Sequence, residues 1–183
     1  IVEQGKISGT LYMILSGKAR VLSQDARGRE VIMATLDVGD CIGEMSLIDG
    51  EPHSATVRAE VQTDVLTLNR ETFLRCVHEN ASMADAVMRG LVRRLRRADK
   101  QIESLALMDV YGRVHTVLLE MAQPDAEGKL ILKQKVSRQD VAKMVGASRE
   151  MVSRVMKHFE DEGTVVDRGD GTFLLTQQAH AVE

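Results

Sequence analysis

The sequence of 183 residues predicts an α+β fold in three parts: an antiparallel, jelly-roll-like β-roll, one long helix and a C-terminal winged helix-turn-helix. Three observations support this fold class. Short apolar runs recur at even spacing in the first part of the chain, an apolar heptad pattern follows, and two short amphipathic helices meet at a glycine near the end. We expect the parts to span residues 1–80, 81–108 and 109–183.

Residues 1–68 are expected to form short strands. The apolar runs that predict them cover residues 11–15, 19–22, 31–36, 56–59 and 65–68. Clusters of Gly, Asp and Pro separate these runs at intervals of roughly ten residues, as turns between strands do. No stretch resembles a βαβ unit, so an antiparallel roll is favoured over a parallel sheet.

One stretch of the roll is different. Residues 42–57 read IGEMSLIDGEPHSATV, and Gly43 is expected to begin a single helical turn over residues 44–47. Backbone amides at the start of such a turn can face an anion, and Ser54 would add a hydroxyl. The alternative is an ordinary turn between two strands.

A long helix with a heptad pattern is predicted for residues 81–105. Apolar residues occupy the a positions (Ala81, Met88, Leu95, Ile102) and the d positions (Ala84, Leu91, Ala98, Leu105). This pattern is typical of a parallel two-helix seam, and it predicts a homodimer. Arg94 at g and Asp99 at e have the spacing of an interhelical salt bridge. The alternative is an amphipathic helix packed on its own domain.

The segment after the long helix is expected to be a hinge at residues 108–111, followed by a helix to about residue 122 and a loop over residues 123–129. Near the C-terminus, Asp170-Gly171 separates two apolar runs at residues 164–166 and 172–175. Asp-Gly between apolar runs is a strong hairpin signal, so this pair predicts the wing.

Residues 136–163 predict a helix-turn-helix. Ser137 and Ser148 stand where the two N-caps belong, and Gly146 can adopt the positive φ of the tight turn between the helices. The second helix has apolar residues at spacings of three and four, namely Val152, Val155, Met156 and Phe159.

The other face of that second helix carries polar and charged residues. They are Arg149, Glu150, Ser153, Arg154 and Lys157. Arginine can bridge guanine O6 and N7, and a carboxylate can accept from cytosine N4, so this face predicts major-groove reading. Ser148 and Arg138 complete the candidate DNA-binding set. The alternative is a helical hairpin with a solvated face.

Composition limits the other classes of function. The net charge is only −3, and aromatic residues make up 3% of the chain, which disfavours base stacking on single strands. Cys41 and Cys76 are isolated, which gives no disulfide or metal pattern. No catalytic constellation is visible, so we expect no enzyme and no metal. No apolar run has the length of a membrane span. The chain starts at Ile1 inside a strand-like stretch, so we expect that natural N-terminal residues are missing.

The order of these features resembles the CRP/FNR family of bacterial transcription regulators over essentially the whole chain. VGASREMVSRVMK resembles the family's recognition element, LALMDVYGRV its hinge and IGEMSLIDGEPHSATV its phosphate-binding cassette. The resemblance implies that Gly43 and Glu44 hold the ribose and phosphate of a cyclic nucleotide and Ser54 a phosphate oxygen. Met45, Ser46 and His53 belong to the same cassette.

The resemblance also implies partners and a location. Arg149, Glu150 and Arg154 would contact bases of palindromic double-stranded DNA with half-sites similar to TGTGA. The protein would be a cytoplasmic homodimer that acts with RNA polymerase and binds no membrane. Its mechanism would be a population shift, in which ligand at the junction of roll and long helix reorients the recognition helices.

Two departures from the family pattern bear on the effector. His53 stands where the cassette has a phosphate-pairing arginine, and Ala98-Asp99 stands where cyclic-AMP-binding members have Thr-Ser. Arg96 and Asp99 form an RxxD pattern similar to motifs that bind cyclic di-GMP, with Arg94 close by. The sequence therefore favours cyclic di-GMP as effector. The alternatives are cyclic AMP, or a ligand-independent regulator with a vestigial cassette.

Overall fold

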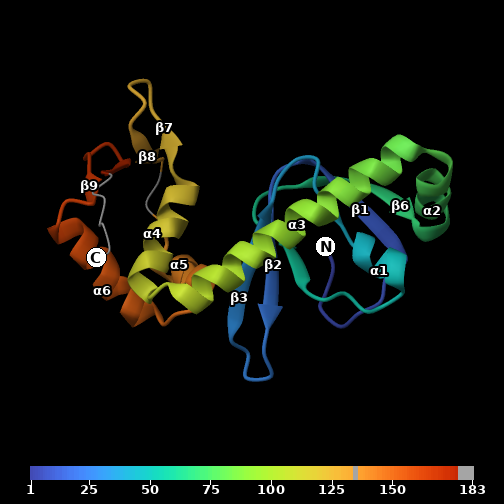
Figure 1. Ribbon diagram of the computed structural model, residues 1–183, viewed down its shortest axis with the longest axis horizontal. Helices are drawn as coiled ribbons and strands as arrows, with labels where there is room; N and C mark the ends of the chain where they lie inside the picture. The colour runs from blue at the N-terminus through green and yellow to red at the C-terminus, as the bar shows by residue number, and fades with distance from the viewer. Residues whose placement is uncertain (134–135, 177–183) are drawn as a thin grey trace. The chain divides into compact units, whose positions relative to one another are not determined.

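The computed structural model describes residues 1–133 and 136–176, and it divides into two compact units, Ile1–Asp99 and Lys100–Glu183 (Figure 1). The boundary falls inside the long helix α3 (Ala81–Leu107), so residues 81–99 of that helix belong with the first unit. Within the described residues, no helix is both long and apolar enough to cross a membrane.

The first unit contains the predicted antiparallel roll. Its strands are β1 (Thr10–Ser16), β2 (Ala19–Gln24), β3 (Glu30–Leu36), β4 (Cys41–Ile42), β5 (Thr56–Ala59) and β6 (Asp64–Asn69). They form two three-stranded sheets with the orders β4-β1-β6 and β3-β2-β5. Every apolar run that predicted a strand forms one. The two-residue β4 escaped prediction because it is too short to show a pattern.

Two apolar clusters hold the first unit together. One joins residues of both sheets, among them Ile14 of β1, Leu36 of β3 and Val57 of β5. The other lies on the outer side of β1, where Leu11 packs with Leu47 and Phe73. The second cluster is covered by helices, so it fixes their positions against the sheet.

Phe73 belongs to a helix that the sequence did not predict, α2 (Arg70–Glu79). The helix begins directly after β6, with no loop between them. Asn69 is its N-cap, and the Asn69 side chain accepts a hydrogen bond from the Thr72 amide at 2.8 Å. The cap was visible in the sequence, but the strand pattern ran up to it and concealed the start of the helix.

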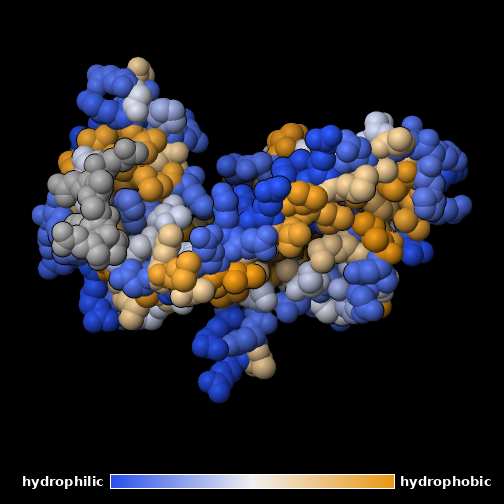
Figure 2. Space-filling view, in the orientation of Figure 1, coloured by the Kyte–Doolittle hydropathy of each residue, from blue (hydrophilic) through white to orange (hydrophobic). Residues whose placement is uncertain are grey.

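The long helix α3 has no buried residue, so its heptad positions are at least partly exposed in the single chain. Met83 and Val87 pack against the outer cluster of the roll. The a positions point elsewhere: Met88 is 57% exposed, Leu95 63% and Ile102 64%. Figure 2 shows the resulting hydrophobic band along this helix. Met88, Leu95 and Ile102 are therefore not covered by their own chain.

The second unit contains the predicted winged helix-turn-helix. Its elements are α4 (Val110–Met121), β7 (Gln123–Pro124), β8 (Leu130–Leu132), α5 (Arg138–Val145), α6 (Arg149–Asp161), β9 (Val165–Asp167) and β10 (Phe173–Leu175). The three helices and the sheet β7-β8-β10-β9 share one core, in which Leu118, Val141 and Phe159 are almost fully buried. Gly146 has a φ of 65°, as the turn between α5 and α6 requires.

Two expectations about the connections need correction. The hinge is shorter than residues 108–111, because α4 already begins at Val110 and Asp109 caps it by accepting from the Gly112 amide at 2.8 Å. Residues 123–129 are not all loop, because Gln123 and Pro124 pair with β8. A two-residue edge strand that contains proline gives no alternating pattern by which to recognise it.

Candidate functional site

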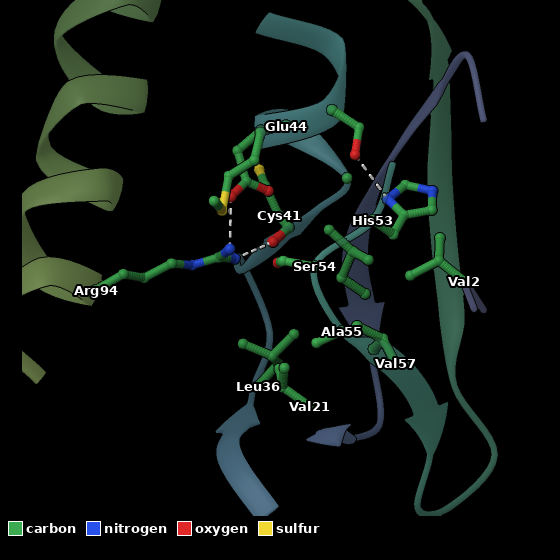
Figure 3. Close-up of a pocket in the computed structure, with 14 residues that line it drawn as sticks. Val2, Val21, Leu36, Cys41, Glu44, His53, Ser54, Ala55, Val57 and Arg94 are labelled. Carbon is green, nitrogen blue, oxygen red and sulfur yellow. Dashed lines mark hydrogen bonds and ion pairs between the residues drawn. The ribbon is translucent and has the colours of Figure 1, made fainter. Parts of the chain in front are cut away.

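The predicted cassette lines a cavity of the first unit that is open to solvent (Figure 3). Its walls include every cassette residue that the sequence singled out, namely Gly43, Glu44, Met45, Ser46, His53 and Ser54, and also Arg94 of α3. Ala55, next to Ser54 in the cassette, also lines the wall. The sequence missed the other apolar residues, which are Val2, Val21, Leu36, Ile42 and Val57, together with Cys41. Their alternation along the strands, which places them on the inner face of the roll, could have identified them.

Gly43 shapes the entrance to α1 (Glu44–Asp49), the short helix of the cassette. Its φ is 90°, and a Cβ at this position would lie 2.9 Å from the carbonyl oxygen of Thr10 on β1. Only glycine fits a backbone that combines this conformation with so close an approach. Because α1 starts there, Glu44 is placed at the wall of the cavity.

Glu44 is a buried carboxylate, 5% exposed, that is only half satisfied. Its Oε1 accepts from Arg94, and the same guanidinium donates to the backbone carbonyl of Cys41 (Figure 3). Its Oε2 is buried and has no hydrogen-bond partner among the described residues. Burial raises the pKa of Glu44 above its usual value, and Arg94 offsets part of that shift.

This contact gives Arg94 a role that the heptad did not suggest. The sequence assigned it to an interhelical pair with Asp99. In the structure its guanidinium instead crosses to the roll and contacts Glu44, fifty residues earlier in the chain. Burial and the nearby Glu44 carboxylate also raise the pKa of the Cys41 thiol, which keeps this cysteine protonated.

His53 lies on the other side of the cavity from Glu44 and Arg94 (Figure 3). The ring is 6% exposed, and both of its nitrogens are hydrogen-bonded. Nδ1 lies 3.0 Å from Ser46 Oγ, and Nε2 lies 3.1 Å from Ser8 Oγ. Ser8 was not flagged by the sequence. The imidazole therefore contacts two hydroxyls already and does not offer a free nitrogen to the cavity.

Arg96 and Asp99 are not brought to this cavity. Both side chains are exposed on α3, and neither belongs to the residues that line the wall. The neighbouring Arg97 approaches the Thr35 carbonyl on β3 at 3.4 Å. The RxxD pattern is thus a surface feature of the first unit.

The candidate DNA-reading residues lie together at the start of α6. Ser148 is the N-cap, and its hydroxyl accepts from the Met151 amide at 3.2 Å. Arg149, Glu150, Arg154 and Lys157 are exposed, while Val152, Met156 and Phe159 on the opposite side are buried. Ser153 is half-buried.

Glu150 is held as an ionised acceptor. A hydrogen bond from its own backbone amide, and then one with the Ser148 hydroxyl, lower the pKa of this carboxyl. A carboxylate at a helix N-terminus is also favoured by the helix dipole. Arg138, the candidate on α5, pairs instead with Glu160 of α6 at 3.0 Å, so its guanidinium already has a partner within the unit.

The described residues contain no group of three or more His, Cys, Asp or Glu side chains placed to hold a metal ion.

Comparisons with known proteins agree with both halves of the structure. Residues 1–80 match the family of cyclic nucleotide-binding domains, and residues 112–179 match the Crp-like helix-turn-helix domains. The cAMP-activated global transcriptional regulator CRP of Salmonella typhimurium is 35% identical over 92% of this chain and 82% of its own length. The chain belongs to the CRP/FNR family of bacterial transcription regulators. The predicted resemblance is therefore confirmed.

Two further relatives differ in the effector that their names state. The cAMP-activated global regulator Vfr of Pseudomonas aeruginosa is 35% identical over 92% of this chain and 82% of its own length. The c-di-GMP-responsive global regulator CLP of Xanthomonas campestris is 26% identical and superposes with a TM-score of 0.77, covering 96% of this chain and 88% of CLP.

Family membership defines the broad function. The chain is a cyclic-nucleotide-responsive, DNA-binding transcription regulator, and it is not an enzyme. The α+β fold with roll, long helix and winged helix-turn-helix is the one expected for this family.

The Glu44–Arg94 pair leads to the first prediction. Arg94→Met leaves a buried, uncompensated carboxylate, which should lower the free energy of unfolding of the first unit by about 2 kcal/mol at pH 7. This is less than for a fully buried pair, because the Arg94 side chain is 39% exposed. Amide hydrogen exchange of β1 and β2 measures the loss.

The pH dependence checks the cause. The pKa of Glu44 is raised in the folded state, so its charge disfavours folding above the unfolded pKa, and protonation relieves this penalty as pH falls through the raised pKa. The defect of Arg94→Met should shrink as the pH is lowered, and adding Glu44→Gln should recover most of it. A defect that is independent of pH and of Glu44 would show that Arg94 acts through packing alone.

Proposed function

We propose that a cyclic purine nucleotide binds in the cavity of the first unit and controls DNA binding by α6. The observation that carries the proposal is the unpartnered, buried Oε2 of Glu44. An unsatisfied buried carboxylate oxygen costs free energy, and a ligand that donates a hydrogen bond to it recovers that cost. A free ribose hydroxyl is such a donor. A 3′,5′-cyclic nucleotide keeps its 2′-hydroxyl free.

Cyclic AMP is the first candidate effector. The names of CRP and Vfr state activation by cyclic AMP, and each is 35% identical to this chain. His53 weakens the fit, because it lacks the charged bidentate fork of arginine for the phosphate.

Cyclic di-GMP, which the sequence favoured, is the second candidate. Its support is the RxxD pattern at Arg96 and Asp99 and the likeness to CLP, whose name states a c-di-GMP response. Both side chains lie outside the cavity, so this effector would need a site that includes the surface of α3.

We propose that α6 reads base edges in the major groove of palindromic DNA. Glu150 is an ionised acceptor at the exposed start of the helix, with Arg154 four residues on and therefore on the same face. A carboxylate among arginines would repel a phosphate backbone, but it can accept from cytosine N4. Arg149 and Arg154 can only donate, so guanines or a thymine O4 suit them. Ser148, Ser153 and Lys157 complete the surface.

We propose that the seam of α3 forms a homodimer, because four apolar seam residues are more than half exposed: Met88, Leu95, Ile102 and Leu105. A palindromic site requires two recognition helices. Ligand at the cavity would bias the seam through Arg94, and the two recognition helices would respond by a shift in population. From family resemblance alone, we place the protein in the cytoplasm with RNA polymerase as a partner.

The effector prediction uses calorimetry. Cyclic AMP should bind the wild type, and 2′-deoxy-cyclic AMP should bind roughly 10- to 100-fold more weakly, since a hydrogen bond to a charged acceptor is lost. In Glu44→Ala the two nucleotides should bind alike. His53→Arg should strengthen cyclic AMP binding by up to roughly a hundredfold.

Cyclic di-GMP is titrated in parallel, with Arg96→Ala and Asp99→Ala as matched variants on the surface of α3. Cyclic AMP binding should not change in either variant. If only cyclic di-GMP binds and both variants lose it, the second candidate replaces the first. If neither nucleotide binds while DNA binding persists, the regulator is independent of these ligands.

The dimer prediction uses two residues that are exposed in the single chain, so that the fold is preserved. Leu95→Asp with Ile102→Asp places four like charges in the seam of a dimer, and sedimentation at micromolar concentration should then show monomers with weak operator binding. The matched control is Ile7→Asp with Val38→Asp, which are 73% and 64% exposed in the roll. If the wild type is monomeric at this concentration, the proposal that the seam of α3 forms a homodimer is wrong.

The DNA prediction compares Glu150→Ala and Arg154→Ala on half-sites altered one base pair at a time, at fixed salt. Glu150→Ala should relax discrimination at one base pair of each half-site by about 1–3 kcal/mol, without weakening all sequences equally. Arg154→Ala should lose more affinity for the specific site than for random DNA. Equal losses on every sequence, with only the salt slope changed, would assign these residues to phosphates.

A further inference from the structure

Met151 is an apolar side chain on the face of α6 that is otherwise polar. It lies in the first turn of the helix and is 39% exposed. Within α6, no other large hydrophobic residue is exposed: Val152, Met156 and Phe159 are buried and Val155 is half-buried. The core of the second unit therefore does not account for the side chain of Met151.

The position of Met151 is well defined by the backbone. Its amide donates to the Ser148 hydroxyl at 3.2 Å, so the residue is tied to the N-cap of the helix. Arg154 follows three residues later, which makes the two side chains neighbours on the helix surface. Glu150 precedes it directly. Met151 thus stands at the edge of the group that we propose to read bases.

We infer that Met151 contacts the 5-methyl group of a thymine in each half-site, beside the base pair that Arg154 contacts. The inference rests on the proposed reading of DNA by α6. In the major groove, thymine presents a methyl group that apolar side chains recognise by contact. Methionine suits this contact because its unbranched, polarisable thioether adapts to an irregular apolar surface.

A single exposed apolar residue is common on protein surfaces and by itself needs no explanation. The first turn of the helix distinguishes this one, because that turn also carries Arg149 and Glu150. A methionine without a DNA contact would leave the response to uracil unchanged when it is replaced by alanine.

The experiment replaces each thymine of the site by uracil, one position at a time and in both half-sites. This change removes only the methyl group. Binding of the full-length wild type should fall about fourfold per half-site at one position, the value for losing one buried methyl contact. Met151→Ala should bind the thymine site more weakly by a similar factor, and it should no longer distinguish uracil from thymine at that position.

Met121→Ala is the matched control, since Met121 is 37% exposed on α4 and lies outside the helix-turn-helix. It should keep the full response to uracil. If the wild type responds to uracil at no position, or if Met151→Ala keeps the wild-type response, the inference is wrong although sequence-specific binding persists. If the wild type binds all sequences alike, the proposed reading by α6 fails first.

Discussion

The contact between Glu44 and Arg94 joins the roll of the first unit to the long helix α3. A carboxylate taken out of water carries a penalty of several kcal/mol unless an opposite charge meets it with good geometry. Here the roll supplies the carboxylate and α3 supplies the guanidinium, which also donates to the Cys41 carbonyl. The pair therefore holds the long helix against the cavity. The packing of Met83 and Val87 against the outer cluster of the roll holds the same part of α3 in place.

The spacing of apolar residues predicted most of the fold, and most of the elements that it missed are very short. The strands of the roll and the helices α3, α5 and α6 each show a repeating apolar pattern with recognisable turns or caps. The two-residue strands β4 and β7 are too short to show one. The helix α2 was missed for another reason. Asn69 ends strand β6 and also caps α2, so no turn residues separate the strand from the helix in the sequence.

The sequence predicted the cassette residues of the candidate site, but it predicted neither the apolar wall nor the contacts between the residues. Every cassette residue that the sequence named lines the cavity, because a glycine-led turn between strands places them close together in the chain. The partners come from afar. Ser8 binds the ring of His53 across 45 positions, and Arg94 reaches Glu44 across 50. Heptad spacing compares residues on one helix only, so it assigned Arg94 to Asp99 and could not detect the carboxylate in the roll.

The helix α6 carries its packing residues on one face and its exposed charged residues on the other. Val152, Met156 and Phe159 supply the packing, while Arg149, Glu150 and Arg154 lie in solvent and contribute little to the core. After gene duplication, the exposed residues of one copy can therefore change without unfolding the protein. With bases read by α6 as proposed, two copies can diverge to different promoters while keeping the same sensor and the same core. Because the exposed residues can change independently of the core, one fold can give rise to many regulators with different DNA sites.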